Sequence, residues 1–327
     1  MDLEGNRYLV TGAAGFIGSH LTESLLNQGG IVDGVDSFTD YYAEAIKRQN
    51  IEGFLTDDKF ELVEQNITEL PLRDRLPEYD GIFHLAAQAG VRASWGEEFD
   101  EYIHQNIRAT QVLLEATKDS APDCPILLAS SSSVYGVPDR MPMVEDMPAQ
   151  PYSPYGVTKL AAENLGMLYH RNFGLNVTAL RFFTVYGPRQ RPDMAFSRFL
   201  TWVKRGQPIT VYGDGSQTRD FSYVEDVVRA LETAYRSDSW GDIFNVGGGN
   251  RVSINEIIEL LEEVTGKKVH RRQEPMPEGD VPHTDADTGR IKDSLGWSPE
   301  VSLRQGLSNQ WDWIRNNDTV LQEIPTP

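Results

Sequence analysis

The stretch YLVTGAAGFIGSH, residues 8–20, decides the fold of this chain. It begins with apolar and β-branched residues, which predict a short buried strand. Gly12, Gly15 and Gly18 follow and lead into an amphipathic segment. Glycines at such a turn let the backbone approach a ligand closely at a helix N-terminus, where unsatisfied N–H groups favour an anion. The G-x-x-G-x-x-G spacing is a variant of the dinucleotide fingerprint and predicts a pyrophosphate site.

The next apolar segment, GIVDGVD, supplies the second half of this motif. It ends at Asp36, 18 residues after Gly18, close to the spacing expected of the acidic residue that binds a ribose 2′-hydroxyl. A carboxylate there repels a 2′-phosphate, and no arginine follows directly. The motif therefore predicts NAD in preference to NADP as the cofactor.

Short apolar segments alternate with helix-length segments over much of the chain, which predicts strands joined by helical crossovers. Two long amphipathic helices are expected at residues 100–118 and 154–172. The fold class is therefore α/β, a doubly wound parallel sheet of the Rossmann type with about seven strands. The expected strands are RYLVT (7–11), GIVDGV (30–35), KFELVE (59–64), GIFHLA (81–86), PILLAS (125–130), NVTALRFF (176–183) and DIFNVG (242–247).

After about residue 183 the sequence becomes richer in proline and loops, which predicts a smaller C-terminal domain that binds the substrate. We expect a nucleotide-binding domain over residues 1–182, a substrate-binding domain over 183–317 and a tail over 318–327. The strand near 242–247 is expected to return to the first domain.

The composition excludes several function classes. The formal charge of −19 is spread along the chain and disfavours binding to nucleic acid or an anionic membrane. Cys124 is the only cysteine and the histidines are not clustered, so neither an internal disulfide nor a metal site is expected. The sequence contains no apolar run near the ~20 residues that cross a bilayer, and its first residues, MDLEGNRYLV, do not resemble a signal peptide. We expect a soluble, cytoplasmic protein. Arginine outnumbers lysine, which together with the dispersed acidic residues suggests a salt-rich cytoplasm.

Tyr155 and Lys159 stand four residues apart in PYSPYGVTKLAAEN and therefore share one face of the expected helix. A lysine ammonium beside a phenol, near a positively charged nicotinamide, favours the phenolate and lets tyrosine act as a base near neutral pH. A second polar feature is the serine run Ser130 to Ser133 in LASSSSVYG, at the end of an expected strand. Such a run is either a solvated turn or part of an active site.

Together these motifs resemble the extended short-chain dehydrogenase/reductase family, the nucleotide-sugar epimerases and dehydratases, along essentially the whole chain. Further segments carry the resemblance: HLAAQAGVR (84–92), SSSSVYG (130–136), RFFTVYGPRQRPD (181–193), VYGDGSQTRDFSYVEDV (211–227) and FNVGGG (244–249). The resemblance implies a catalytic triad of Ser131, Tyr155 and Lys159, with Ser131 bonding the sugar O4. It implies NAD contacts from Gly12, Gly15, Phe16, Ile17, Gly18, Asp36, Asn66, Ile67, Leu85, Ala86, Ala87, Asn106, Tyr155, Lys159 and Phe182. Asn66 stands where the family often has aspartate, and an amide carbonyl can accept the same hydrogen bond from adenine.

On the substrate side, the resemblance assigns Arg219 to the nucleotide diphosphate, Tyr212 to a uridine pocket and Asp280 to the uridine ribose. Arg92 is a weaker candidate for the diphosphate or the sugar rim. Arg219 could instead form a surface ion pair with Asp220 or Glu225. A cleft in so acidic a protein needs local positive charge to hold an anionic substrate, which favours the phosphate role.

The family carries out 4-epimerisation, 4,6-dehydration, decarboxylation and reduction. Dehydratases place a carboxyl acid and base directly after the catalytic Ser or Thr, and this chain has Ser132 and Ser133 there, which disfavours dehydration. An epimerase needs no extra acid, because the 4-keto sugar turns within the cleft and takes back the same hydride. Many UDP-glucose epimerases have asparagine at the position of Thr184.

The run RFFTVYGPRQRPDMA and the segment HLAAQAGVR look more like UDP-glucuronate 4-epimerases. A 4-keto glucuronate is a β-keto acid, so an epimerase must hold its carboxylate out of alignment with the carbonyl. Ser132, Ser133 and Thr184 could donate neutral hydrogen bonds and Arg191 a cation for this purpose; alternatively, Arg191 lies exposed in a loop. The alternatives are a UDP-glucose 4-epimerase and, less favoured, a UDP-glucuronate decarboxylase or a non-catalytic NAD-binding regulator. The resemblance also implies a homodimer through a four-helix bundle of the helices at 100–118 and 154–172.

Overall fold

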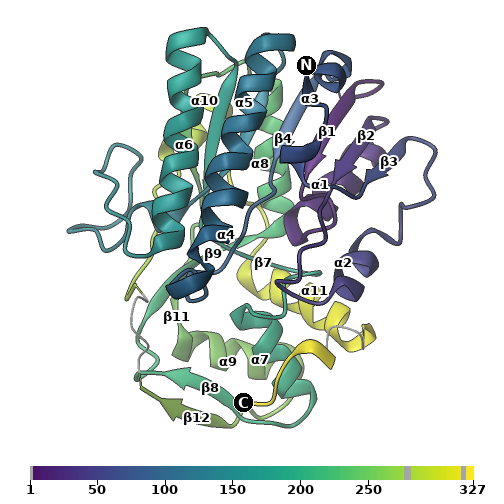
Figure 1. Cartoon of the computed structure of the whole chain (residues 1–327). Coiled ribbons are helices and arrows are strands. Elements are labelled where there is room, and N and C mark those ends of the chain that lie inside the picture. The colour runs from purple at the N-terminus through teal and green to yellow at the C-terminus, as the bar shows by residue number, and fades with distance from the viewer. Residues whose placement is uncertain (1–2, 276–280, 318–321) are drawn as a thin grey trace.

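The computed structural model describes residues 3–275, 281–317 and 322–327. Seven parallel strands form the central sheet, in the order β10-β6-β5-β4-β1-β2-β3 (Figure 1). This confirms the expected doubly wound parallel sheet, including the return of the strand near residue 245 to its edge. The strands are β1 (Arg7–Thr11), β2 (Ile31–Val35), β3 (Phe60–Val63), β4 (Gly81–His84), β5 (Ile126–Ser131), β6 (Val177–Phe182) and β10 (Ile243–Val246).

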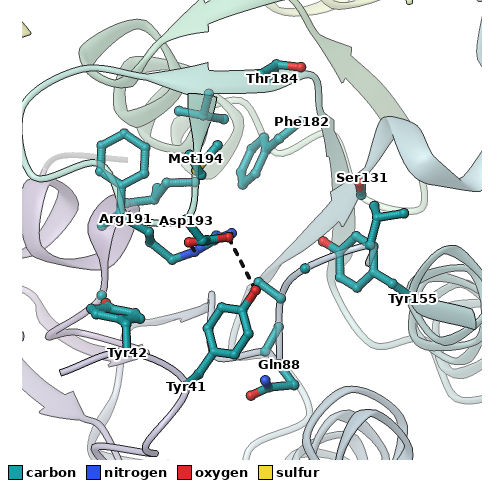
Figure 2. A pocket seen from close by; sticks show the side chains of 18 of the residues that line it. Tyr41, Tyr42, Gln88, Ser131, Tyr155, Phe182, Thr184, Arg191, Asp193 and Met194 are labelled. Carbon is teal, nitrogen blue, oxygen red and sulfur yellow. Dashed lines mark hydrogen bonds and ion pairs between the residues drawn. The ribbon is translucent and has the colours of Figure 1, made fainter. Parts of the chain in front are cut away.

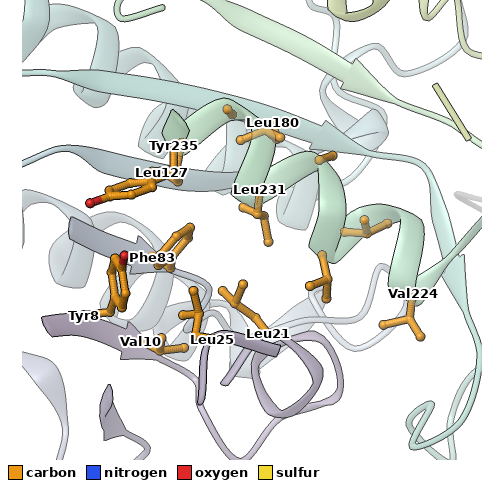
Figure 3. Close-up of a cluster of buried hydrophobic side chains, with 14 of the residues drawn as sticks. Tyr8, Val10, Leu21, Leu25, Phe83, Leu127, Leu180, Val224, Leu231 and Tyr235 are labelled. Carbon is orange, nitrogen blue, oxygen red and sulfur yellow. The ribbon is translucent and has the colours of Figure 1, made fainter. Parts of the chain in front are cut away.

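Helices cover both faces of this sheet because its strands carry apolar side chains on both sides. On one face, α1 (Phe16–Asn27) and α8 (Val224–Arg236) enclose a core in which Tyr8, Phe83 and Tyr235 pack ring against ring (Figure 3). On the other face, apolar side chains of α5 (Ala109–Ser120) and α6 (Pro154–Phe173) join a second core with those of β4, β5 and β6. Short elements, α2 (Glu44–Ile51) and α3 (Leu72–Arg75), flank β3.

The two long helices expected at 100–118 and 154–172 are both present. The first is a continuous helical segment of α4 (Phe99–Tyr102), a π-helical stretch (Ile103–Arg108) and α5. The second is α6, which Ser153 caps by accepting a hydrogen bond from the Gly156 N–H, 3.1 Å apart, and which ends at left-handed Gly174. Figure 1 shows α5 and α6 side by side along the sheet.

The second half of the chain builds a smaller unit below the carboxyl ends of the strands (Figure 1). A three-stranded sheet has the order β11-β9-β7 and a two-stranded sheet pairs β12 with β8. Their strands are β7 (Thr184–Tyr186), β8 (Ile209–Tyr212), β9 (Thr218–Tyr223), β11 (Arg251–Ser253) and β12 (Arg271–Glu274). The core of this smaller unit contains apolar residues of α7 (Ala195–Lys204), α9 (Ile254–Thr265) and α11 (Leu303–Asn316). The remaining helix, α10 (Gly289–Leu295), lies beside β10 of the central sheet. The cleft between these two parts holds the site.

Candidate active site

A cavity of about 710 Å³ runs along the carboxyl ends of the parallel strands. This is where ligands bind in open α/β sheets, because the loops that follow the strands converge there. The cavity wall contains residues from both halves of the chain. The expected site residues in its wall are Gly12, Gly15, Phe16, Ile17, Gly18, Asp36, Asn66, Ile67, Leu85, Ala86, Ala87, Arg92, Ser131, Ser132, Ser133, Tyr155, Lys159, Phe182, Thr184, Arg191, Tyr212 and Arg219.

The glycine turn forms one end of the cavity. A Cβ on Gly18 would lie 2.0 Å from the Gly12 carbonyl oxygen, and one on Gly12, which has a φ of +72°, would lie 2.9 Å from the Ala86 nitrogen. Only glycine lets the turn come this close to the start of α1. No side chain caps α1, and Gly15, Phe16 and Ile17 at its start line the cavity, so its first N–H groups are available to a ligand there. The turn is therefore shaped to hold an anion at a helix N-terminus.

Asp36 follows β2 and is fixed by backbone donors. The Ala14 N–H donates to one of its carboxylate oxygens at 3.1 Å and the Phe38 N–H to the other at 2.9 Å. Burial raises the pKa of Asp36, and these hydrogen bonds and the charge of Lys47 oppose the rise. Lys47, in α2, donates to the Thr39 carbonyl and lies 4.9 Å from the Tyr42 ring centre. The loop after β2 thus presents a partly buried carboxylate beside a cation.

Ser131, Tyr155 and Lys159 come together on one wall, as expected. Ser131 ends β5, and Tyr155 and Lys159 lie in the first turns of α6. Burial raises the pKa of Tyr155, whereas its hydrogen bond with Ser131 and the charge of Arg191 lower it. Burial lowers the pKa of Lys159 to about 8, with Glu163 opposing the change. The cation that acts on the phenol across the cavity is therefore Arg191, which the Y-x-x-x-K spacing alone did not reveal.

The four serines have different roles in the structure, so the run is not a solvated turn. Ser130 is buried and donates to Glu163 at 2.6 Å. The sequence predicts that this strand ends at Ser130, but β5 continues one residue further, to Ser131. The Ser131 hydroxyl accepts a hydrogen bond from the Ser133 N–H at 3.1 Å, which turns the chain so that Ser132 and Ser133 also face the cavity.

Asn106 differs from the expected cofactor contact. Among the described residues, it stands behind the cavity wall, 2% exposed. Its carbonyl accepts from the Gln88 N–H at 2.8 Å, and its amide donates to the Gln88 carbonyl at 3.0 Å and to the Thr158 hydroxyl at 2.9 Å. Asn106 thus ties the loop after β4 to the start of α6, because both polar atoms of its amide are satisfied internally.

Asn66 lines the cavity, but its carbonyl oxygen is occupied. It accepts from the Thr68 N–H at 3.0 Å and from the Thr68 hydroxyl at 2.8 Å, while its amide donates to Gln105 at 3.2 Å. A carbonyl oxygen has two lone pairs, and both are used here. The expected hydrogen bond from adenine to this oxygen would therefore have to displace one of the bonds from Thr68.

The opposite wall is built by two loops from different halves of the chain (Figure 2). Arg191 donates from Nε and Nη2 to the two oxygens of Asp193, each at 3.0 Å, and Tyr41 donates to Asp193 at 3.2 Å. Although burial opposes it, Arg191 holds the pKa of Asp193 below its usual value. The Arg191 side chain is 21% exposed, so it is a cavity group instead of a freely solvated loop residue. Figure 2 shows Arg191 and Asp193 facing Ser131 and Tyr155 across the cavity.

Three of the residues assigned to the nucleotide or the sugar rim, Arg92, Tyr212 and Arg219, line the cavity. The Arg92 guanidinium stacks 4.7 Å from the centre of the Tyr212 ring. Arg219 donates to the Thr218 carbonyl at 2.9 Å and to the Pro282 carbonyl at 3.1 Å, and it lines the cavity. The Asp220 carboxylate accepts hydrogen bonds from the backbone of Gly248 and Ala286. Asp280 lies outside the described residues.

Sequence reasoning missed several residues of the wall. Tyr41, Lys47, Asp193 and Arg198 all line the cavity. The Nε atom of Arg198 is buried and has no hydrogen-bond partner among the described residues, which makes this arginine a further candidate cation for an anionic ligand. Asp193 was within reach of the sequence, because it stands two residues from Arg191, whereas no spacing links Tyr41 to either.

The described residues offer neither a metal site nor a membrane-spanning helix. No grouping of His, Cys, Asp and Glu side chains in the described ranges could hold a metal ion. Within the same ranges, no helix has both the length and the apolar character required to span a membrane.

Known proteins resemble this chain over nearly its full length. The family model described as GDP-mannose 4,6 dehydratase matches residues 9–310. The chain belongs to this family, within the extended short-chain dehydrogenases/reductases. The resemblance inferred from the motifs is therefore confirmed.

Individual members of the family give a finer comparison. A UDP-glucuronate 4-epimerase of Thermodesulfobacterium geofontis (strain OPF15) is 39% identical over 322 residues, covering 97% of this chain and 98% of the relative. A protein of Bacillus subtilis (strain 168) named as an uncharacterized UDP-glucose epimerase, YtcB, is 40% identical over 306 residues, covering 93% and 96%. The crystal structure of UDP-glucuronic acid 4-epimerase from Bacillus cereus in complex with UDP-glucuronic acid and NAD has a TM-score of 0.91 at 41% identity, covering 95% of this chain and 99% of that one.

Proposed function

We propose that this protein is an NAD-dependent 4-epimerase that interconverts UDP-glucuronate and UDP-galacturonate. The observation that carries the proposal is the pairing of two walls: Ser131 and Tyr155 on one, and Arg191 on the other, across a single cavity. The first wall suits proton removal from a sugar hydroxyl, and the second supplies a cation for a sugar carboxylate. The relatives named for this reaction support the same conclusion.

The residues present fit NAD. Gly12, Gly15 and Gly18 form a cradle that any Cβ would fill, and the uncapped start of α1 would hold the pyrophosphate. Asp36 lies where its carboxylate would accept hydrogen bonds from the ribose hydroxyls, and the same carboxylate disfavours a 2′-phosphate. When bound, NAD⁺ would accept a hydride from the sugar C4 and return it as NADH.

The chain's own residues move the proton. Tyr155 takes the proton of the sugar 4-hydroxyl, with the Ser131 hydroxyl bonding the sugar O4 and passing the proton between them. Ser131 and Arg191 both oppose the effect of burial on the Tyr155 pKa, which helps the phenol act as a base. After the 4-keto sugar has turned within the cleft to present its other face, the Tyr155 phenol returns the proton to O4. Proton and hydride are both restored, so no external acid is consumed.

Arg191 is proposed to hold the sugar carboxylate. A 4-keto glucuronate loses CO₂ when the bond to its carboxylate aligns with the carbonyl π system. An ion pair with Arg191, together with hydroxyls of Ser132, Ser133 and Thr184 from the cavity wall, would hold the carboxylate away from that alignment. In this structure the Arg191 guanidinium is paired with the Asp193 carboxylate, so the substrate carboxylate must compete with Asp193 for Arg191 or rearrange the pair.

Dehydration is not supported by the site, although the family description names a dehydratase. Elimination of water across C5 and C6 needs an acid and a base beside the catalytic serine, and Ser132 and Ser133 provide only hydroxyls in the cavity wall. The second candidate function is UDP-glucose 4-epimerisation, which the relative YtcB is named for. A smaller substrate without the carboxylate would leave Arg191 paired with Asp193.

The deciding experiment is incubation of the protein with UDP-glucuronate and UDP-galactose in separate reactions. We expect the C4 epimer of UDP-glucuronate without CO₂ or pentose. Turnover of UDP-galactose alone would defeat the proposed carboxylate contact, and CO₂ as the main product would identify a decarboxylase.

We also propose that two copies associate through α5 and α6 to form a four-helix bundle. Ile103, Val157 and Leu168, in the helical segments α4–α5 and α6, are 39–49% exposed, and covering apolar side chains of this size favours association. A light-scattering mass of one chain would refute the dimer.

Three further expectations belong with this proposal. The domain boundaries 1–182, 183–317 and 318–327 remain predictions that limited proteolysis tests; α8, within the second range, packs with α1 in the core of the central sheet. A cytoplasmic location and a salt-rich cytoplasm remain predictions. Stability that does not rise between low and molar salt would contradict the second of these.

A further inference from the structure

An ion pair is buried beneath the catalytic wall. Glu163, in α6, accepts two hydrogen bonds from Arg181 of β6, from Nε at 2.9 Å and from Nη2 at 2.7 Å, and a third from Ser130 of β5 at 2.6 Å. Glu163 and Arg181 are 2% and 4% exposed. Arg181 also donates to the Tyr135 hydroxyl at 2.8 Å. The Glu163 carboxylate is therefore held by β5, the strand that also carries Ser131, and by β6.

Stability alone does not explain such a pair. Removing two charges from water costs several kcal/mol per ion, and well-packed apolar residues often stabilise a core as well or better. None of the three side chains, Ser130, Glu163 and Arg181, touches the reacting sugar in the proposed mechanism. Their arrangement suggests a role exercised through a neighbour.

That neighbour is Lys159, one helical turn before Glu163 on the same face of α6. Lys159 is 6% exposed, and among the described residues no ion pair shorter than 4.0 Å joins it to Glu163, so the carboxylate acts through its field. Among the described residues, the charge of Lys159 also acts on His84 of β4, Tyr155 precedes Lys159 by four residues on α6, and Arg181 of β6 is paired with Glu163. His84 bonds the neutral Thr110 of α5 at 3.1 Å, and the neutral Asn106 of the π-helical stretch donates to Thr158 of α6 at 2.9 Å.

We propose that Glu163, fixed by Ser130 and Arg181, is a positioning residue that keeps Lys159 in its ammonium form beside Tyr155. This inference rests on the proposed function, because it concerns the lysine that the sequence predicts to favour the phenolate of Tyr155. The buried pair of Glu163 and Arg181, which lies outside the catalytic motif of Tyr155 and Lys159, thereby acquires a role in catalysis.

The direction in which Glu163 shifts the Lys159 pKa agrees with this proposal. Burial lowers the pKa of Lys159 to about 8, and Glu163 is the group that raises it. Burial, with the charge of Lys159, lowers the pKa of His84 to about 3, so His84 is neutral and supplies no competing charge. A fall in the Lys159 pKa of even one unit would leave half of the lysine neutral near pH 7. Without Glu163, the lysine would lose much of its charge near neutral pH.

The test measures the pKa of Lys159 directly, so it needs no substrate. Protein carrying ¹³C-labelled lysine, with NAD bound, is titrated by NMR, and the Lys159 signal is assigned with Lys159→Arg. We expect Glu163→Gln to lower this pKa by about one to two units. Arg181→Lys is the matched control, because it disturbs the same hydrogen bonds and keeps both charges; it should leave the Lys159 pKa within about 0.3 units.

The functional consequence is a displaced pH profile. In Glu163→Gln the alkaline limb of kcat/KM for UDP-glucuronate should move to lower pH, so that activity falls about tenfold at pH 8 and less than about twofold at pH 6. A merely structural role would lower activity by the same factor at every pH. If Glu163→Gln does not fold, the double variant Glu163→Gln with Arg181→Gln leaves no uncompensated buried charge and should show the same direction of shift.

The outcomes separate the two hypotheses. An unchanged Lys159 pKa in Glu163→Gln, or an equal change in Arg181→Lys, overturns the inference whatever the substrate. If the Lys159 pKa falls as expected but the wild-type protein turns over neither UDP-glucuronate nor UDP-galactose, the role of Glu163 stands and the proposed function fails.

Discussion

The two walls of the cleft are built in different ways. The wall with Ser131, Tyr155 and Lys159 consists of the end of β5 and the first turns of α6. Both elements pack into the core that α5 and α6 share with β4, β5 and β6. The wall with Arg191 and Asp193 consists of a loop after β7, and its contact to Tyr41 comes from a loop after β2. Regular elements thus carry the proposed proton transfer, and a loop carries Arg191, the proposed cation for the sugar carboxylate.

The difference between the two walls shows how substitutions in such a site can alter the substrate specificity while the reaction stays the same. Loops tolerate substitution more readily than core strands and helices do. The loop around Arg191 is nevertheless anchored to the nucleotide half: His20 of α1 bonds the Pro188 carbonyl at 2.9 Å, and Arg189 pairs with Glu23 at 2.7 Å. The position of Arg191 is therefore linked to the helix that would carry the pyrophosphate.

The largest effect is expected on the catalytic wall. Tyr155→Phe removes the proton acceptor and should lower kcat for UDP-glucuronate by about a thousandfold or more, with NAD content and folding preserved. Steady-state turnover and the NAD absorbance of the purified protein measure both. Tyr152→Phe is the control, because Tyr152 is 53% exposed nearby; comparable loss in that variant would break the assignment of the base.

The next effect tests the rigidity of the nucleotide end. Gly18→Ala would place a Cβ 2.0 Å from the Gly12 carbonyl oxygen, so the turn and α1 must separate. We expect at least a tenfold loss of bound NAD and a melting temperature lower by several degrees. Gly53→Ala, where a Cβ meets nothing within 4 Å, should change neither quantity. Retention of NAD by the Gly18 variant would show that the turn is not the anion site.

The loop wall should respond selectively. Arg191→Met should raise KM for UDP-glucuronate by about ten- to a hundredfold, because a charge-assisted hydrogen bond to the carboxylate is lost. Any activity on UDP-glucose should change far less, since that sugar has no carboxylate. Parallel kinetics with both substrates measure the ratio, and an equal loss for both would mean that Arg191 acts on Tyr155 and not on the sugar.

The smallest effect concerns the contact between the two loops. Tyr41→Phe removes one hydrogen bond to Asp193, worth about 1 kcal/mol, so KM for UDP-glucuronate should change by less than about tenfold and kcat hardly at all. Tyr42→Phe, on the adjacent residue, is the control. A large loss of kcat would show that this contact supports the catalytic wall, and the separation of roles would then fail.

Much of this protein was determined by its sequence alone. Strand and helix periodicity gave the seven-stranded sheet and its helices, and Gly12, Gly15, Gly18 and Asp36 marked the nucleotide end of the cavity. Tyr155 and Lys159 were found because both stand on one helix, four residues apart. These features depend on residues close together in the chain, where spacing fixes geometry.

Only the tertiary structure decided the remaining contacts. It placed Asn106 behind the wall, paired Arg191 with Asp193, brought Tyr41 to Asp193 across 152 residues of chain, and set Arg181 against Glu163 beneath Lys159. Such contacts depend on how strands and loops are arranged after folding. Because no periodicity relates residues from different loops and layers, their pairing follows only from the packed fold.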